Sequence, residues 1–373
     1  MIERVKNKIK KELNLMKGSF LSIESPSQNQ RVDTPFLKIS GFVVDQEDID
    51  IDAVQISIEG KSYSVYEIET PDLKFHYPKK QSKGFQIVIN GESNWQENLL
   101  VVITYKDSET PLNIIFNTQN LDTYIHDRTS KLNQLKNIVS SQFGFENEAI
   151  LSISKEQFSE IETTGNVSDH DYDPTAKAII NEFKDGFILD AGCGLRSVYY
   201  PNVVNLEIVD YPTTDVIGFA DKLPFPDNTF DAVFSLNVLE HVRDPFTSAK
   251  ELERVLKPGG KLYVAVPFLQ PFHGYPNHYY NMTTSGLKNL FSDKLTNVDC
   301  GVLDAGHPIY ALSWMLTSYK NGLSASDSAK FGELSVNELI GLASKQNNGL
   351  IASLNPKVQE ELSCVNYLLA EKL

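Results

Sequence analysis

The chain has 373 residues, of which 41% are hydrophobic and 22% charged, a balance that excludes an intrinsically disordered protein. Its length predicts two domains, since a domain typically holds roughly 100–200 residues. The 49 acidic and 34 basic residues give a net charge of −15, which repels phosphate backbones, so we expect no nucleic-acid partner. Three scattered cysteines form no CxxC pair, so we expect no disulfide framework and a cytoplasmic protein.

The first segment, residues 1–18, is predicted to form a basic amphipathic helix. Within residues 1–17, apolar side chains recur at helical spacing and lysine and arginine fill most other positions. The segment lacks the continuous apolar centre of a signal peptide or a membrane span. Such a helix could lie on anionic lipid at the inner face of the membrane or dock on protein, and the pattern leaves both alternatives open.

Short strands are predicted over residues 19–118. Apolar residues mark runs at 36–39, 54–58, 63–68, 85–89, 99–105 and 112–116, separated by Gly, Asn, Asp and Pro. About seven strands in roughly one hundred residues is typical of a β-sandwich. On the stretches at 39–43 and 84–87, the segment resembles the immunoglobulin-like modules that accompany some glycan-modifying enzymes. It would be a structural or partner-binding module, or else a substrate-binding one.

A helical linker is predicted over residues 119–167, with Leu132, Leu135 and Val139 on one stripe. The stretch at 168–174 then gathers one histidine and three aspartates, which could ligate a metal. Consecutive acids before a proline are common turn chemistry, however, and no second ligand set is visible, so we expect a loop and no metal. The alternation of strand, loop and helix that follows predicts a Rossmann-like, doubly wound α/β domain over 168–324.

A glycine-rich turn is predicted directly after the apolar run at 187–189. It reads Asp190-Ala191-Gly192-Cys193-Gly194, and its two glycines allow the backbone to approach a ligand and to adopt positive φ. In a doubly wound sheet such a turn lies at the carboxyl end of a central strand, where ligands bind. Ser197 stands where the third glycine of a dinucleotide fingerprint would fall, so a nicotinamide dehydrogenase is a poorer interpretation.

Further motifs follow this turn in order. A second short strand at 203–207 ends in Glu207, an acid suited to binding ribose hydroxyls. Next come Leu223-Pro224-Phe225, then Leu239-Glu240-His241, then Arg254-Val255-Leu256-Lys257-Pro258-Gly259-Gly260 and a strand at 261–266. Over residues 185–291 this set closely resembles the class I S-adenosylmethionine-dependent methyltransferases, in the branch marked by LPF and LEH segments.

The resemblance implies a sheet that binds S-adenosylmethionine along its carboxyl edge. Ten residues would hold the cofactor: Asp190, Gly192, Cys193 and Gly194 at its methionine part, Glu207 at its ribose, Ala220 and Asp221 at its adenine, and Ser235, Leu236 and Asn237 at its sulfonium. Two features depart from the family pattern. The short interval after Gly194 predicts that the usual helix is either shortened or replaced by an irregular segment at 196–201. Phe219 replaces an acid, where it would stack on adenine or leave the polar contact to Asp221.

The loop after the strand at 261–266 is rich in histidine and tyrosine, in the place where this fold receives its methyl acceptor. His273 and His278 could take a hydroxyl proton at neutral pH, with His241 as a third candidate, and each could equally be structural. Three tyrosines suit a sugar ring or an aromatic acceptor, or packing as a lid: Tyr275, Tyr279 and Tyr280.

We therefore expect an O-methyltransferase that acts on a sugar, glycan or glycolipid intermediate, followed by a helical C-terminal extension over 325–373. The acceptor class follows from the pattern at 273–276, which resembles methyltransferases found with bacterial surface-glycan assembly. One alternative is a methyltransferase for a quinone-like or secondary-metabolite small molecule. The other is a catalytically inactive scaffold that recruits a partner through its β-sandwich.

Overall fold

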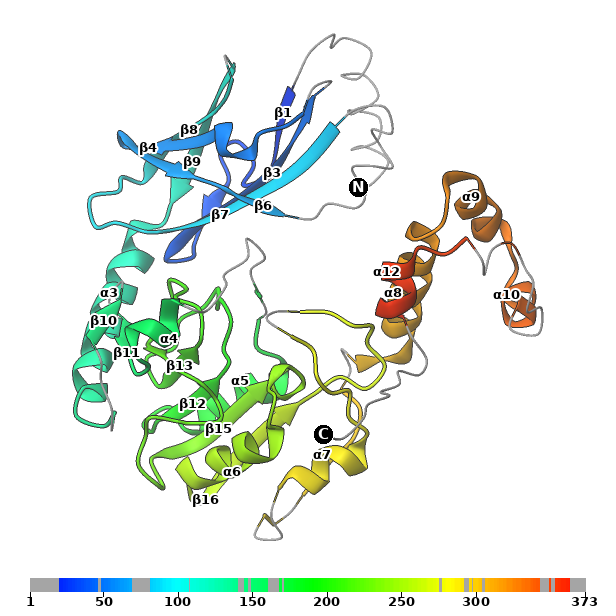
Figure 1. The fold of residues 1–373 in the computed structure, drawn as a ribbon. Coiled ribbons are helices and arrows are strands. Elements are labelled where there is room, and N and C mark those ends of the chain that lie inside the picture. Colours follow the sequence, from blue (N-terminus) through cyan, green and yellow to red (C-terminus); the bar gives the residue numbers. More distant parts are fainter. Residues whose placement is uncertain are drawn as a thin grey trace. The chain divides into compact units, whose positions relative to one another are not determined.

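A computed structural model describes residues 20–45, 48–68, 81–106, 108–139, 144–146, 149–159, 168–169, 171–274, 277–291, 295–296, 298–303, 306–342, 349 and 353–362 (Figure 1). The chain forms two compact units, one of residues 1–219 with 224–226 and one of residues 220–223 with 227–373. The predicted basic helix at 1–18 lies outside the described residues. None of the described helices is long and apolar enough to cross a membrane.

Two sheets with a shared hydrophobic core form the first part of the first unit. Their strands are β1 (Phe20–Ser25), β2 (Arg31–Val32), β3 (Phe36–Asp45), β4 (Val54–Ile58), β5 (Lys61–Ser64), β6 (Tyr66–Ile68), β7 (Gln81–Asn90), β8 (Asn98–Tyr105) and β9 (Ser108–Phe116), with a 3-10 turn η1 (Ile51–Ala53) before β4. One sheet has the order β1-β3-β7-β6 and the other β2-β9-β8-β4-β5. Leu37 and Phe85 from one sheet and Leu99 from the other belong to the same buried cluster.

The predicted single run at 63–68 is wrong, because it is split between the two sheets. β5 pairs with β4 in one sheet and β6 pairs with β7 in the other, both antiparallel. Val65 separates them and is 5% exposed, with its side chain in the shared core. The chain therefore changes sheet at Val65, a step that alternation of apolar residues along one strand cannot reveal.

Helix α3 (Thr118–Leu135) follows β9 and begins at Asn117, whose side chain accepts a hydrogen bond from the Asn120 backbone N–H at 3.2 Å. Leu121, near its start, packs into the core of the two sheets. Leu132 and Leu135 are buried as predicted, whereas Val139 is buried beyond the end of the helix. The helix also buries two cations that the sequence pattern did not single out, Arg128 and Lys131.

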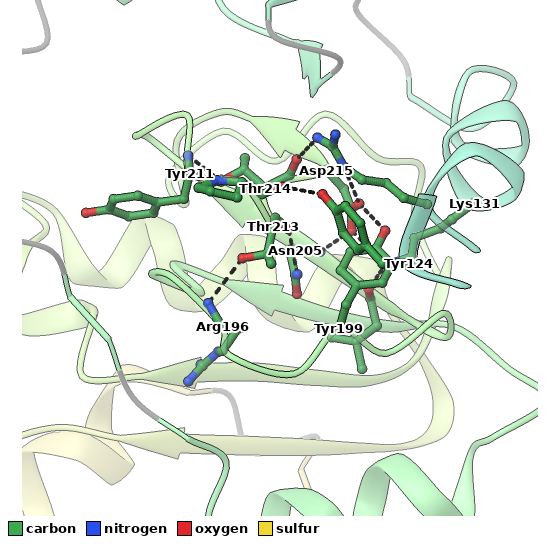
Figure 2. A network of polar contacts seen from close by, with 12 residues as sticks. Tyr124, Lys131, Arg196, Tyr199, Asn205, Tyr211, Thr213, Thr214 and Asp215 are labelled. Atoms are coloured by element: carbon green, nitrogen blue, oxygen red, sulfur yellow. Dashed lines mark hydrogen bonds and ion pairs between the residues drawn. The ribbon is translucent and has the colours of Figure 1, made fainter. Parts of the chain in front are cut away.

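Lys131 belongs to a buried polar network that converges on Asp215, in the loop before β14 (Val216–Ile217) (Figure 2). Its Nζ lies 2.8 Å from Oδ2 of Asp215, donates to the Val203 carbonyl, and sits 3.8 Å from the centre of the Tyr199 ring. Lys131 is 1% exposed and Asp215 is fully buried. Because a buried charge is stable only when paired and hydrogen-bonded, this network fixes α3 against the α/β part of the unit.

A mixed α/β sheet completes the first unit. Its strands are β10 (Gly144–Glu146), β11 (Ala149–Leu151), β12 (Ile188–Ala191), β13 (Val203–Glu207) and β14, in the order β10-β11-β14-β13-β12. β10 runs antiparallel to β11, and the other neighbours in this series are parallel. Helices α4 (Lys155–Ser159) and α5 (Pro174–Glu182) accompany it. No helix joins β12 to β13, since residues 192–202 are irregular throughout, which is the second of the two predicted alternatives.

The acidic stretch at 168–174 supplies structural contacts where the structure describes it. Asp173 caps α5 through its side chain, which accepts from the Ala176 backbone N–H at 2.8 Å. Asp169 pairs with Lys38 of β3 at 3.0 Å, and Asp171 accepts from the Ser197 hydroxyl. His170 lies outside the described residues. The contacts of the three aspartates are those of a loop.

The second unit contains the parallel pair β15 (Phe230–Leu236) and β16 (Leu256–Ala265), joined by the 3-10 turn η2 (Leu239–His241) and helix α6 (Pro245–Val255). β16 begins five residues earlier than predicted, because the register shift between Phe230 and Ala232 accommodates the Pro-Gly-Gly turn within the strand. Five more helices are α7 (Thr284–Leu290), α8 (Pro308–Asn321), α9 (Ala325–Glu333), α10 (Val336–Leu342) and α12 (Pro356–Glu361). Around α8 and α9, Leu323, Phe331 and Leu354 form a small core.

Candidate functional site

The glycine loop follows β12 directly and has the backbone that its sequence requires. Gly192 has a φ of 84° and Gly194 a φ of 62°, values that residues with a Cβ rarely adopt. A Cβ on Gly194 would lie 2.7 Å from the backbone oxygen of Ser168. Both the positive φ and the close approach of a neighbouring segment therefore require glycine at this position.

We expect Gly194→Ala to weaken cofactor binding and to lower the thermal midpoint of unfolding. The αL conformation costs a residue with a Cβ about 1–2 kcal/mol, and the clash with Ser168 displaces the loop. Gly60→Ala is a matched control, because Gly60 has a φ of 80° with no atom within 4 Å of a Cβ. Calorimetric titration and thermal melts of both variants check the prediction, and equal losses of affinity would contradict it.

Asp190, at the end of β12, is fully buried and held by two residues that the sequence analysis did not select. The Tyr172 hydroxyl donates to its Oδ2 at 2.5 Å, and Arg196 donates to the same oxygen from Nε at 3.0 Å and from a terminal nitrogen at 2.8 Å. Oδ1 has no hydrogen-bond partner among the described residues. Arg196 lies in the short irregular segment after Gly194. The unusual length of that segment was the one sequence feature that could have drawn attention to this residue.

A cavity of about 110 Å³ adjoins this buried cluster, with Tyr172, Arg196 and Ser197 in its lining. The Arg196 guanidinium lies 4.2 Å from the centre of the Tyr172 ring. Burial raises the pKa of the Tyr172 hydroxyl well above its ordinary value, so the phenol stays protonated and donates to Asp190. The cavity thus offers a cation and hydrogen-bonding groups beside the glycine loop.

Glu207, at the end of β13, connects the second strand to the glycine loop. Its Oε2 accepts from the Gly194 backbone N–H at 2.8 Å, and its Oε1 accepts from the Ile208 N–H at 2.7 Å. Burial of the carboxyl group raises its pKa, while these N–H donors oppose the rise. Cys193 precedes Gly194 in the chain and is buried. Burial raises the pKa of its thiol well above the ordinary value, so the thiol stays protonated and unreactive.

The remaining predicted cofactor residues lie in the second unit. Ala220 is buried and Asp221 is exposed. At the end of β15, Ser235 is fully buried and its hydroxyl has no hydrogen-bond partner in the described part of the chain. Leu236 is half-buried, and Asn237 is exposed with a φ of 57°, its N–H donating to Ala265 at 2.9 Å. In the first unit, Phe219 packs against the cluster of Ala149, Leu151, Ile153 and Ile217.

The three predicted catalytic histidines lie together in the second unit. The ring centre of His273 is 5.3 Å from that of His241 and 4.4 Å from that of His278. Burial lowers the pKa of all three imidazoles below their ordinary value, so they are neutral near pH 7. His278 uses both ring nitrogens, since Nδ1 accepts from the His273 backbone N–H and Nε2 contacts Oδ1 of Asn281 at 3.0 Å.

His241 and His273 each use one ring nitrogen. Nδ1 of His241 lies 2.7 Å from the Asn277 carbonyl, and Nδ1 of His273 lies 2.7 Å from the Pro271 carbonyl. Because a carbonyl can only accept, both Nδ1 atoms carry the proton and both Nε2 atoms present a lone pair. Two proton acceptors, or two metal ligands, are therefore available from these side chains.

Glu240 lies in the LEH segment but is not among the predicted site residues. It is fully buried, and neither carboxylate oxygen has a hydrogen-bond partner among the described residues. Its Oε1 lies 3.8 Å from Nε2 of His241, and burial raises its pKa to about 8. Its backbone carbonyl accepts from Tyr279 and Tyr280, at 2.7 and 3.2 Å. A buried charge without a partner is costly, so burial favours the protonated, neutral form of this acid near pH 7.

The structure describes two of the three tyrosines that were predicted to bind the acceptor. Tyr279 is 44% exposed and Tyr280 is 42% exposed, and their ring centres are 6.3 Å apart. The Tyr280 hydroxyl donates to the Arg243 carbonyl at 3.2 Å. Tyr275 lies outside the described residues. The two described tyrosines thus present aromatic surface beside the histidines.

Residues 189–264 match a family model described as a methyltransferase domain. An uncharacterised methyltransferase of Schizosaccharomyces pombe is 46% identical over 63 residues, which cover 17% of this chain and 23% of that protein. A ubiquinone/menaquinone biosynthesis C-methyltransferase of Pasteurella multocida is 44% identical over 109 residues, covering 28% and 37%. The chain thus spans less than half the length of either relative.

Among solved structures, an S-adenosylmethionine-dependent methyltransferase from Thermotoga maritima, described as a possible histamine N-methyltransferase, is similar. The sequence identity is 23% and the TM-score 0.23, with 28% of this chain and 61% of that chain covered. The family match carries the assignment by itself. Residues 189–264 form a methyltransferase domain with a Rossmann-like α/β fold, and S-adenosylmethionine is the cofactor that this domain implies.

Proposed function

We propose that this protein is an S-adenosylmethionine-dependent methyltransferase that methylates a hydroxyl group of a sugar, glycan or glycolipid intermediate. The observation that carries the activity is the ordered motif set of residues 189–264, which matches the methyltransferase family model. The acceptor class rests on the resemblance of the loop at 273–276 and on the exposed tyrosine faces beside two imidazole lone pairs. Cofactor and acceptor are separate parts of the proposal.

The residues of the first unit fit the cofactor. The glycine loop has positive φ at Gly192 and Gly194, so no Cβ blocks a ligand that approaches its backbone. Asp190 keeps one buried oxygen without a partner, and Glu207 brings a second carboxylate to a strand end. The Asp190 oxygen that lacks a partner among the described residues is a group that a polar cofactor would satisfy.

When bound, S-adenosylmethionine supplies a methyl group on a sulfonium, and transfer is an in-line displacement. The protein then has to align the acceptor oxygen and remove its proton. A neutral imidazole with a lone pair on Nε2 could perform this second task, and His241 and His273 are the two candidates. Tyr279 and Tyr280 would hold the acceptor ring through their faces, as aromatic side chains hold sugars and other rings.

A quinone-like small molecule is the second candidate acceptor. It is favoured by the Pasteurella multocida relative, whose name assigns it to ubiquinone and menaquinone biosynthesis as a C-methyltransferase. Transfer to carbon also needs a proton to be removed, so the imidazoles do not discriminate between these acceptors. The inactive scaffold stays the third alternative.

Turnover of labelled S-adenosylmethionine with the full chain distinguishes the three proposals. The panel should contain nucleotide sugars, glycans and glycolipid intermediates, with demethylated quinones as the second class. We expect label in the sugar class, at an oxygen located by mass spectrometry after permethylation. Label only in quinones would favour the alternative, and tight cofactor binding without any turnover would favour the scaffold.

The N-terminal third of the chain, residues 1–118, has proposed roles of its own. We propose that residues 19–118 are an immunoglobulin-like module that recruits a partner or substrate, and that residues 1–17 contact anionic lipid or a protein from the cytoplasmic side. Co-sedimentation of the full chain with liposomes of phosphatidylserine, with and without residues 1–17, tests the lipid contact. We expect binding to fall on truncation, and unchanged binding would exclude this segment as the anchor.

A further inference from the structure

We propose that Glu240, His241 and His273 form a binding site for one divalent transition-metal ion of the zinc class. The three side chains lie in the second unit, and one ligand atom from each falls within 4.8 Å of the other two. Sequence spacing gave no indication of such a site, because His273 is 32 positions beyond His241. The inference goes beyond the proposed methyl transfer, in which the same Nε2 atoms could accept a proton only while no ion is bound, and it is tested without cofactor or acceptor.

The first support is the orientation of the imidazoles. Both His241 and His273 donate Nδ1–H to a backbone carbonyl at 2.7 Å, which leaves Nε2 of each ring with a lone pair for a metal, and Nε2 of His241 lies 3.8 Å from Oε1 of Glu240. Metal-binding histidines nearly always donate their other ring N–H to a carbonyl or carboxylate, which fixes the tautomer and the ring orientation. The protein therefore already fixes both rings in the tautomer that a metal would need.

The second support is the buried carboxylate. Glu240 is fully buried, and its two oxygens lack hydrogen-bond partners within the described part of the chain. Removing an acid from water without a partner costs several kcal/mol, roughly, whereas a coordinated cation offsets that cost. The backbone carbonyl of this residue accepts hydrogen bonds from the backbone N–H groups of Tyr279 and Tyr280. These bonds fix the position of the segment without using the Glu240 side chain.

The third support is the way in which the loop at 271–274 approaches His241. A Cβ on Gly274 would lie 2.2 Å from Cε1 of the His241 ring, and Gly274 has a φ of 85°. Glycine is therefore required for the backbone beside His273 to lie against His241. His278 adjoins the cluster but uses both ring nitrogens, which leaves it outside the ligand set.

Two nitrogens and one carboxylate oxygen select the ion. Imidazole and carboxylate ligands suit Zn²⁺, Fe²⁺, Co²⁺ and Ni²⁺, whereas Mg²⁺ and Ca²⁺ prefer oxygen ligands alone. Bonds of about 2.0–2.2 Å place neighbouring ligand atoms roughly 3.4 Å apart, so two ligand atoms that lie 4.8 Å apart need to come about 1.4 Å closer to each other. Three protein ligands leave a coordination position open, as in catalytic zinc sites.

Zinc titration of the full chain after chelator treatment tests the site, with a chromophoric chelator as competitor. We expect one equivalent to bind, with Glu240→Gln and His273→Gln each lowering the affinity by at least about 100-fold, since even partners outside the ligand set are worth 10–100-fold. His126→Gln, an exposed histidine of α3, is the matched control and should leave the affinity unchanged.

Cobalt spectroscopy of the unsubstituted chain keeps the test independent of variant folding. Bound Co²⁺ should give visible absorption that one equivalent of Zn²⁺ removes, and Gly274→Ala should weaken it by displacing the His241 ring. Absence of zinc binding at micromolar ion overturns the proposal, as does unchanged affinity in both ligand variants. If Glu240→Gln and His273→Gln lose zinc binding but still bind the cofactor normally, the result supports the metal site whatever the methyl acceptor is.

Discussion

Replacing Asp215 by alanine is expected to lower the free energy of unfolding by about 3–5 kcal/mol, because it leaves a buried lysine without its counter-ion. Lys131 lies 2.8 Å from Oδ2 of Asp215 and is 1% exposed, so water cannot take the place of the carboxylate (Figure 2). Burial already lowers the pKa of Lys131, and loss of Asp215 removes the largest influence that opposes this shift. Urea unfolding of the full chain, followed by circular dichroism, measures the loss.

The expected loss also includes hydrogen bonds that Asp215 accepts. The Tyr199 hydroxyl donates to Oδ1, and the Asn205 backbone N–H donates to Oδ2 at 2.9 Å. The Asn205 N–H lies in β13, so the carboxylate joins the helix, the strand and the loop before β14. Removing an acceptor leaves these buried donors unsatisfied, at a cost of about 1–3 kcal/mol for each.

An exposed ion pair provides the control for the buried one. Lys38 and Asp169 lie 3.0 Å apart with both side chains about one-third exposed, so Lys38→Met should cost less than about 1 kcal/mol. The double variant Lys131→Met with Asp215→Asn should lose less free energy of unfolding than the sum of the losses in the two single variants, because no lysine charge is left buried. Additive losses in that double-mutant cycle would show that the pair is not the source of the stability.

The parts of the fold that were predictable are those fixed by local sequence. The strand at 203–207 was predicted with its observed bounds, because an apolar run that ends in an acid has one simple interpretation in an α/β sheet. The irregular connection after Gly194 followed from its length alone. In contrast, the change of sheet at Val65 depends on which strands lie beside β5 and β6, and that is a tertiary property.

Buried charges were the main feature that the sequence could not reveal. Lys131 and Arg128 lie on a helix whose apolar stripe was recognised, and charged side chains are usually exposed. Their partners, Asp215 and the Thr214 carbonyl, are more than 80 positions away in the chain, at separations of 84 and 86. Only the folded structure brings them together, so a one-dimensional pattern assigns both cations to solvent.

Some features of the candidate site were likewise predictable from the sequence, and others depend on the folded structure. The positive φ values of the glycine loop were predictable, because they follow from a residue type and a known turn. His273 and His278 were selected for their concentration in one loop and His241 as part of the LEH segment, but the tautomers of His241 and His273 depend on the carbonyls of Asn277 and Pro271. Glu240 was overlooked because an acid in a polar motif is ordinary in sequence, and only its complete burial makes it exceptional.

Substituting Glu207 by glutamine is expected to lower the affinity for S-adenosylmethionine by about 100-fold. Two hydrogen bonds from ribose hydroxyls to a charged acceptor are worth about 3 kcal/mol together, which corresponds to about two orders of magnitude in Kd. The amide would also turn an N–H group toward a backbone donor, since Glu207 accepts from Gly194 at 2.8 Å and from Ile208 at 2.7 Å. Calorimetric titration measures the affinity, with the exposed Glu109→Gln on β9 as control.

A second ligand separates ribose recognition from damage to the glycine loop. If Glu207 binds the ribose hydroxyls, the unsubstituted protein should bind S-adenosylhomocysteine more tightly than its 2′-deoxy analogue, by about tenfold for one lost hydrogen bond to a charged group. Glu207→Gln should lose that discrimination, because the acceptor that distinguishes the two ligands has been weakened. If Glu207 only positions Gly194, the substitution should weaken both ligands equally and the discrimination should persist. The ratio of the two affinities therefore decides between direct contact and support of the loop, even where the variant is less stable.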